Sequence, residues 1–228
     1  VRWQAPLPVA ILACVGVGIL CGAVNGFFVV RWQLPAFIVT LGMLEAARGG
    51  AYLVTGSKTQ YIGTGIEWIN RGNFMGLSLP FLCAMLVVLA GQFLLSYTTA
   101  GRSMYAIGGN EEAARLSGIA VGRVKLLVYM ICGGLASLAA VIHCARLTAA
   151  DPNAGIGYEL QAIAAVVIGG TSLMGGRGKV INTLFGVIII AVLESGLVQI
   201  GAQEPLKRLV TGGIIVAAVI IDYYRRKI

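Results

Sequence analysis

The chain contains seven runs of mainly apolar residues, and most of them have the length of a helix that crosses a membrane. A helix needs about 20 apolar residues to span the hydrocarbon core of a bilayer. A water-soluble fold could not cover this much apolar surface, because 58% of the residues are hydrophobic and only 11% are charged. We therefore predict an all-α fold, a polytopic transmembrane helical bundle of six or seven spans that forms a single domain over residues 1–228. The runs cover about residues 7–30, 34–55, 79–97, 125–147, 159–175, 180–199 and 208–223.

The fifth run, at about 159–175, leaves the number of spans open. At about 1.5 Å per residue, a helix of this length barely crosses the membrane core, and the run ends in the glycine-rich sequence TSLMGGRGK. Glycine pairs break a helix, and irregular backbone at this depth is tolerated only where protein or water surrounds it. We expect either a short span or a re-entrant segment, and we place Thr171 and Ser172 among the candidate residues of a translocation path.

The positively charged residues predict how the spans are oriented, since Lys and Arg are enriched in cytoplasmic loops. With seven spans and the C-terminus inside, ten bases fall on the cytoplasmic side and seven on or near the outer side. The inner set is Arg31, Arg102, Arg115, Arg123, Lys125, Arg177, Lys179, Arg225, Arg226 and Lys227, and the outer set is Arg2, Arg48, Lys58, Arg71, Arg146, Lys207 and Arg208. Because loops of a membrane protein explain the net charge of +8, we predict no nucleic-acid partner.

The polar segment 98–124 carries the pattern of a short ordered helix between two spans. A good N-cap residue is followed by two carboxylates in the first turn, where the helix dipole favours them. One glycine is positioned to end the helix and two others to form a turn before it. In chain order these residues are Gly108, Gly109, Asn110, Glu111, Glu112 and Gly118. We predict an exposed, charged helix over residues 111–117, and a solvated connector without a binding role is the alternative.

Three sequence blocks resemble, in the same order, blocks of the permease subunits of ABC importers for ribose, xylose and arabinose. The first, LPAFIVTLGMLEAARGGA at Leu34 to Ala51, is similar to a membrane block of that family. The second, within 98–124, resembles the EAA-type cytoplasmic loop of such permeases. The third, from Gly157 to Val180, resembles their C-terminal signature. The resemblance covers essentially the whole chain.

By this resemblance, segment 98–124 is a cytoplasmic coupling loop whose short helix docks in a groove of a separate ATPase subunit. Closure of the ATPase dimer would then switch the spans between outward and inward access. The residues to which the resemblance gives this role are Gly101, Arg102, Gly108, Gly109, Asn110, Glu111, Glu112, Ala113, Ala114, Arg115, Ser117 and Gly118.

The same resemblance implies the partners and the substrate class. Two permease subunits would form the channel as a homodimer in the bacterial inner membrane, and two cytoplasmic ATPase subunits would drive it. A periplasmic sugar-binding protein would deliver a monosaccharide. We expect a ribose-like sugar, with xylose, arabinose, galactose or inositol as alternatives and branched-chain amino acids as a more distant one. Family members are longer at the N-terminus, so we expect this chain to lack the family's N-terminal third.

Polar and ionisable residues inside the apolar runs are costly there, so each is a candidate for function. Glu45 and Arg48 lie three residues apart and could either pair with each other or line the translocation path. Glu194 could form a buried helix–helix hydrogen bond or contact substrate. Asn25 follows a glycine-rich stripe that suits close helix packing. A packing or interfacial role is expected for His143, which stands alone near an outer helix end.

The sequence contains no catalytic or metal-binding pattern. It has no Ser–His–Asp set, no HExxH motif and no carboxylate pair in a polar pocket, which disfavours an intramembrane enzyme. Its five cysteines lie singly in apolar runs, without the spacing of a metal site. The glycine-rich segment at 169–179 lacks the GK[ST] triplet of a P-loop, so we expect no cofactor here and ATP bound by the partner ATPase. A structural membrane anchor is a further alternative, which the ordered 98–124 segment disfavours.

Overall fold

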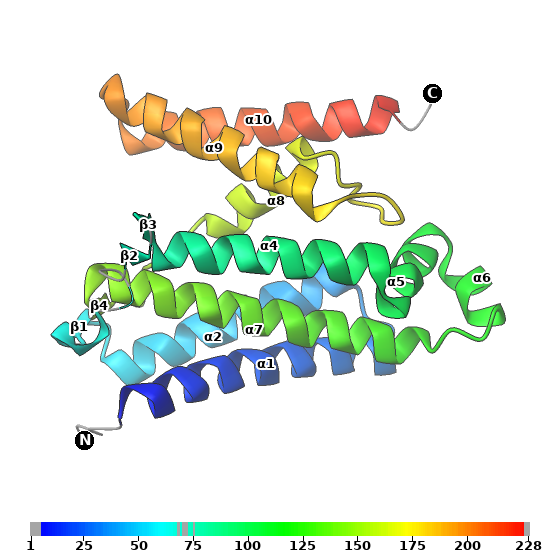
Figure 1. The fold of residues 1–228 in the computed structure, drawn as a ribbon, viewed down its shortest axis with the longest axis horizontal. Helices are drawn as coiled ribbons and strands as arrows, with labels where there is room; N and C mark the ends of the chain where they lie inside the picture. Colours follow the sequence, from blue (N-terminus) through cyan, green and yellow to red (C-terminus); the bar gives the residue numbers. More distant parts are fainter. Residues whose placement is uncertain (1–5, 68, 70–72, 75, 226–228) are drawn as a thin grey trace. The chain divides into compact units, whose positions relative to one another are not determined.

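The computed structural model describes residues 6–67, 69, 73–74 and 76–225, and these residues are mainly helical (Figure 1). Five helices among them are long and apolar enough to cross a membrane. Each matches one of the predicted runs, so the predicted helical membrane bundle is confirmed, with five candidate spans among the described residues where six or seven were predicted. They are α1 (Leu7–Arg31), α2 (Ala36–Thr55), α4 (Leu79–Tyr97), α7 (Val121–Leu147) and α9 (Val180–Gln199).

The chain folds into two compact units, and it passes from one to the other within α4, after α6 and after β4. The first unit comprises Val1–Ala84 and Ala120–Ala154, and the second comprises Met85–Ile119 and Gly155–Ile228. The further elements of the first unit are β1 (Gln60–Tyr61), the short helix η1 (Thr64–Ile66), β2 (Asn73–Phe74), β3 (Leu77–Ser78) and β4 (Ala149–Ala150). Those of the second are α5 (Thr99–Gly109), α6 (Glu111–Leu116), α8 (Tyr158–Ile168) and α10 (Glu204–Arg225).

In the first unit, α1 and α7 lie side by side and run in opposite directions (Figure 1). Glycines bring their backbones into contact, because Gly18 faces Gly133 and Gly22 faces the carbonyl group of Tyr129 one turn further along. A Cβ atom at either position of α1 would overlap backbone atoms of α7. Close packing of small residues supplies the van der Waals contact that holds membrane helices together, since lipid gives them no hydrophobic reason to associate. The predicted packing role of the glycine-rich stripe is confirmed.

The connections at one end of α1 and α7 pack together over a small core. β1 pairs antiparallel with β4, with Gln60 opposite Ala150, and a second short ladder joins β2 to β3. The Tyr52 hydroxyl of α2 donates a hydrogen bond to the side-chain oxygen of Asn153 at 2.8 Å. These contacts tie the end of α2 to the segment that follows α7. The buried residues beneath them are Ile66, Ile69, Val141 and Ala145.

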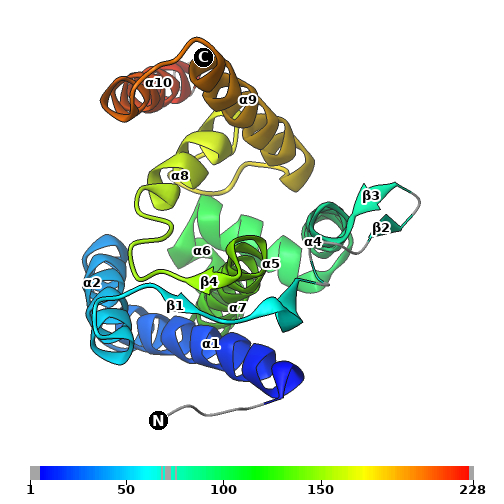
Figure 2. The ribbon, with the colours of Figure 1, turned by 90° about the vertical axis from the view of Figure 1, so that its left-hand side faces the viewer.

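In the second unit, α8 packs against both α9 and α10 (Figure 2). Gly186 of α9 faces the backbone of Ala165, and Gly169 at the end of α8 faces the backbone of Asn182. The two helices therefore run antiparallel with their backbones in contact. The core of this group is formed by Ala164, Ala165 and Ile190, against which Ile168, Ile214 and Ile215 pack.

Helix α8 is shorter than the apolar run predicted at about 159–175. It ends at Ile168 and is followed by irregular residues 169–179, which we call the glycine loop. Its 11 residues correspond to about 16 Å of helix, roughly half the thickness of the hydrocarbon core. Gly170 has a φ of +77°, a conformation that residues with side chains rarely adopt. The predicted break at the first glycine pair is thus confirmed, and the helix ends seven residues before the end of the predicted apolar run.

The last predicted run, 208–223, lies within the 22-residue helix α10. The predicted orientation of the chain rests partly on Arg2, Arg71, Arg226 and Lys227, which lie outside the described residues. The orientation stays a prediction.

We expect the substitution Gly22→Ala to destabilise the protein and Gly16→Ala to leave it unchanged or slightly more stable. Both glycines lie in α1, but a Cβ atom at Gly22 would meet the α7 backbone, whereas nothing lies within 4 Å of one at Gly16. Overpacking of this kind costs about 1–3 kcal/mol. The measurement is the thermal unfolding midpoint of each variant in detergent. Equal midpoints for the two variants would show that backbone contact between α1 and α7 does not limit stability.

Candidate functional site

Segment 98–124 contains a helix that was not predicted, α5, in front of the predicted one. The Thr98 hydroxyl caps α5 by accepting a hydrogen bond from the backbone N–H of Gly101, over 3.2 Å. Gly108 and Gly109 form the last turn of α5. The prediction that this pair forms a turn between elements was therefore wrong, and at Gly108 the reason for glycine is a close contact described below.

Helix α6 forms where the sequence predicted a charged helix, and its ends are capped as expected. The Asn110 side-chain oxygen accepts a hydrogen bond from the backbone N–H of Ala113 at 3.0 Å. Gly118 ends the helix with a φ of +82°, and its N–H donates to the carbonyl oxygen of Arg115 at 3.0 Å. Glu111 and Glu112 both lie in the first turn. An isolated helix of two turns is unstable in water, so these caps and the contact with α5 hold α6 in place.

One face of α6 is buried and the other is open. Ala114 is buried, whereas Glu112, Arg115 and Ser117 are exposed. Arg115 lies 3.4 Å from the carboxylate of Glu111 one turn earlier, and an exposed pair of this type adds little stability. Leu116 is 85% exposed at the end of the helix. The open face of α6 thus combines both signs of charge with an uncovered apolar side chain, a composition suited to binding another protein.

Helix α5 lies directly against the glycine loop. The Tyr105 hydroxyl donates a hydrogen bond to the carbonyl oxygen of Gly178 at 2.6 Å, and Gly108 faces the backbone of Gly175 and Gly176. Gly176 has a φ of +76°, which glycine adopts without strain. Side chains at these positions would keep the two backbones apart. The 98–124 block and the C-terminal block, separated in the sequence, therefore meet through glycine.

The glycine loop is also ordered by its own hydrogen bonds. The backbone N–H of Ser172 donates to the carbonyl oxygen of Arg177 at 3.0 Å, and the Ser172 hydroxyl accepts from the N–H of Met174 at 3.3 Å. The hydroxyls of Thr171 and Thr183 lie 3.4 Å apart. Thr171 and Ser172, predicted as path residues, thus have partners within this loop and at the start of α9. Their predicted contact with substrate stays untested.

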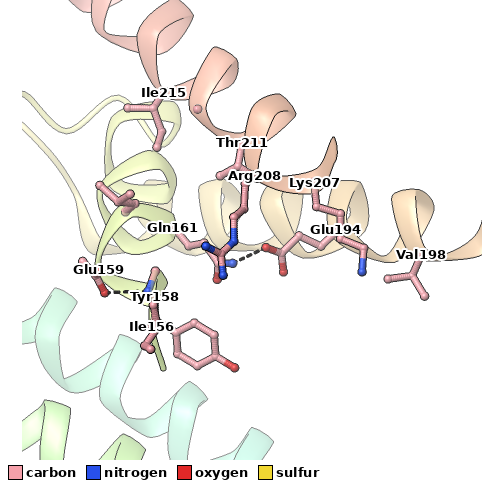
Figure 3. A pocket seen from close by; sticks show the side chains of 13 residues that line it. Ile156, Tyr158, Glu159, Gln161, Glu194, Val198, Lys207, Arg208, Thr211 and Ile215 are labelled. Carbon is pink, nitrogen blue, oxygen red and sulfur yellow. Dashed lines mark hydrogen bonds between the residues drawn. The ribbon is translucent and has the colours of Figure 1, made fainter. Parts of the chain in front are cut away.

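A pocket of about 480 Å³ lies between the beginning of α8, the end of α9 and the beginning of α10 (Figure 3). The side-chain amide of Gln161 in α8 donates a hydrogen bond to the carboxylate of Glu194 in α9. Arg208 extends from α10 into the same pocket (Figure 3). The predicted helix–helix hydrogen bond of Glu194 is confirmed, and the same residue also lines a cavity. The other polar lining side chains include Tyr158, Glu159, Lys207 and Thr211.

The remaining predicted path residues belong to the first unit. Within the described residues, Glu45 and Arg48 form no salt bridge with each other, so the alternative of a local ion pair is not realised. The side-chain oxygen of Asn25 is buried and has no hydrogen-bond partner among the described residues. His143 is half-buried in α7, as expected for a packing role.

Four residues of these surfaces were absent from the sequence-based set. The exposure of Leu116 became evident only from the position of α6 in the structure. The role of Tyr105 became evident only from its hydrogen bond to the glycine loop. Gln161 carried a usable signal, since a lone amide inside an apolar run requires a partner on a neighbouring helix. Arg208 was counted only for orientation. Among the described residues, no three His, Cys, Asp or Glu side chains lie close enough to hold a metal ion.

Comparison of the sequence with known proteins identifies the family of this chain. A family model described as "Branched-chain amino acid transport system / permease component" matches residues 1–219. The chain is 42% identical to the ribose import permease protein RbsC of Escherichia coli strain K12, over 94% of this chain and 68% of that protein. It is 43% identical to RbsC of Bacillus subtilis strain 168, over 87% of this chain and 62% of that protein.

A third relative is the L-arabinose transport system permease protein AraH of Escherichia coli strain K12. It is 36% identical over 90% of this chain and 62% of that protein. The chain thus spans about two thirds of the length of these curated relatives. No solved structure matches it.

We expect Gly108→Ala to loosen the glycine loop and Gly109→Ala to leave it intact. A Cβ atom at Gly108 would overlap the backbone of Gly176, whereas nothing lies within 4 Å of one at Gly109. Both changes raise helix propensity in α5 equally. The exposed Arg177 and Lys179 of the loop are cleavage sites for trypsin. Limited proteolysis should cut the Gly108→Ala variant several-fold faster, and equal rates would contradict the contact.

Proposed function

Because the chain belongs to the branched-chain amino acid transport system / permease component family, we propose that it is the permease subunit of an ATP-driven importer whose α6 docks on the ATPase. The family agrees with the resemblance of the three sequence blocks. The observation that carries the docking proposal is the connection of α6, through α5, to the glycine loop between α8 and α9. A force on an exposed helix can thereby reach helices in the membrane.

Helix α6 has the properties of a docking element. It is capped at both ends and presents Glu112, Arg115 and Leu116 to the outside. Charges at the rim of an interface select the partner and orient it, while a buried apolar anchor supplies most of the affinity. Leu116 is the anchor in this proposal, and Glu112 and Arg115 set the register of α6 in the groove of the ATPase.

The contact between α5 and the glycine loop gives the route of transmission. Gly108 and Gly176 touch through their backbones, and the Tyr105 hydroxyl holds Gly178. Backbone contact leaves no side chain to rearrange, so a displacement of α5 moves the loop with it. The loop in turn connects α8 to α9, and the closure of the ATPase dimer would shift both helices between the two access states.

The proposed substrate is a monosaccharide of the ribose type. Its support is the similarity to permeases named for ribose and for L-arabinose import. We further propose that two copies of the chain form the channel in the bacterial inner membrane, with the C-terminus in the cytoplasm. A periplasmic binding protein delivers the sugar, and ATP is bound by the partner ATPase rather than by this chain.

Substitutions on the open face of α6 test the docking proposal. Leu116→Ala, and the double reversal Glu112→Lys with Arg115→Glu, should each weaken binding of the cognate ATPase. Loss of an apolar anchor costs about 1–2 kcal/mol, about tenfold in Kd. The unfolding midpoint should not change, because these side chains are exposed. Co-purification and sugar-stimulated ATP hydrolysis are the measurements.

The control for the α6 variants is Lys58→Glu, which changes an exposed charge in the segment between α2 and α4. It should co-purify with the ATPase like the unmodified chain. Undiminished complex formation and ATP hydrolysis in the Leu116 and charge-reversal variants would refute docking through α6.

Cysteine labelling tests the proposed orientation. In a chain without its native cysteines, Ser117→Cys should resist impermeant thiol reagents in intact cells and react in inverted membrane vesicles. Lys58→Cys, assigned to the outer side, should show the opposite behaviour. Both positions are exposed in the structure, so in vesicles stripped of the ATPase access depends on the side of the membrane alone. Labelling of Ser117→Cys from outside would reverse the topology.

A further inference from the structure

The pocket of the second unit has the size and the lining of a small-molecule site. Its volume of about 480 Å³ falls within the range of ligand pockets, which also combine apolar walls with a few oriented polar groups. Leu160, Val198 and Ile215 supply apolar surface here. The side chains of Gln161, Glu194 and Arg208 come from three different helices and lie together at the Gln161–Glu194 hydrogen bond (Figure 3).

The polar groups of the pocket match the needs of hydroxyl groups. A carboxylate has two oxygens with about four acceptor sites, and the Gln161 amide occupies one of those of Glu194. Arg208 brings five N–H donors, and Thr211 adds a hydroxyl that can donate and accept. A sugar hydroxyl likewise donates one hydrogen bond and accepts others. Neighbouring hydroxyls of one ring could therefore bind Glu194 and Arg208 together.

The charges of the pocket favour a neutral ligand. Two carboxylates, Glu159 and Glu194, balance two cations, Lys207 and Arg208. For a phosphate or an anionic lipid headgroup, repulsion by the two carboxylates offsets the attraction of the two cations. Intermixed charges with apolar walls suit an uncharged polyol.

We propose that this pocket binds a monosaccharide on its way through the permease, with Glu194, Gln161 and Arg208 as the hydrogen-bonding residues. The proposal rests on the proposed function for the choice of ligand. The position of the pocket supports it. Its α8 residues begin at Tyr158, and the other end of α8 leads into the glycine loop that contacts α5. One short helix therefore joins the sugar site to the element that carries α6.

Protection of an introduced cysteine by D-ribose tests the proposal directly. Val198→Cys places a thiol in the pocket, where the native side chain is 58% exposed. Ile200→Cys is the matched control outside this pocket, at a side chain that is 76% exposed. The five native cysteines are replaced by alanine, and each variant is assembled with its ATPase and binding protein in lipid nanodiscs. Thr211→Cys reports from α10 in the same way.

Ribose should slow modification of Val198→Cys and of Thr211→Cys, but not of Ile200→Cys. At a concentration about ten times the Kd, occupancy reduces the free fraction, and hence the rate, about tenfold. Adding Glu194→Gln to Val198→Cys should raise the ribose concentration needed for protection by about 10- to 100-fold, because a hydrogen bond to a charged group is lost. L-Leucine and anionic phosphatidylglycerol should give no protection.

Separate outcomes identify which proposal fails. If the assembled importer takes up ribose but ribose protects neither Val198→Cys nor Thr211→Cys, the pocket is not a sugar site and the proposed function stands. If ribose protects these positions but the importer takes up no sugar, the proposed function fails and the site stands. Protection by phosphatidylglycerol or L-leucine in place of ribose would overturn the assignment of a neutral polyol.

Discussion

Backbone contact at glycine holds the helices of this chain together, and the remaining features depend on it. Lipid is as apolar as leucine, so membrane helices gain stability from close approach rather than from leaving the solvent. Gly22 brings α1 onto α7, and Gly186 brings α9 onto α8. The same device joins α5 to the glycine loop, at Gly108 and Gly176. These contacts are stiff, because two backbones in contact have no side chain between them. Two elements that meet in this way can therefore move only together.

The elements that could be predicted from the sequence are those set by local interactions. Lengths of apolar runs identified five membrane helices, and the N-cap at Asn110 with the glycine at Gly118 identified α6. Errors arose where a distant contact decides the structure. Gly108 resembles a turn residue in isolation, but its role is to meet Gly176, which lies far away in the sequence. The family resemblance correctly singled out both blocks and said nothing of their contact.

Polar residues in the apolar runs show the same limit. Spacing along one helix suggested a pair between Glu45 and Arg48 that does not form, whereas Glu194 finds Gln161 on another helix. A sequence gives the spacing of residues on one helix, but the partner across a helix contact depends on which faces meet. The pocket follows the same rule, since its lining comes from three helices. Its four charged side chains belong to separate segments of the sequence, and only the packing of α8, α9 and α10 brings them into one pocket.

The shortness of α8 has a consequence for how the protein enters the membrane during synthesis. A segment of 11 helical residues is too short to be stable across the bilayer as an independent span, which needs about 20. It must enter together with α9, as a helical hairpin closed by the glycine loop and held by the contact between Gly186 and Ala165. Biogenesis of this part of the chain is therefore cooperative: α8 cannot take its place before α9 has been made.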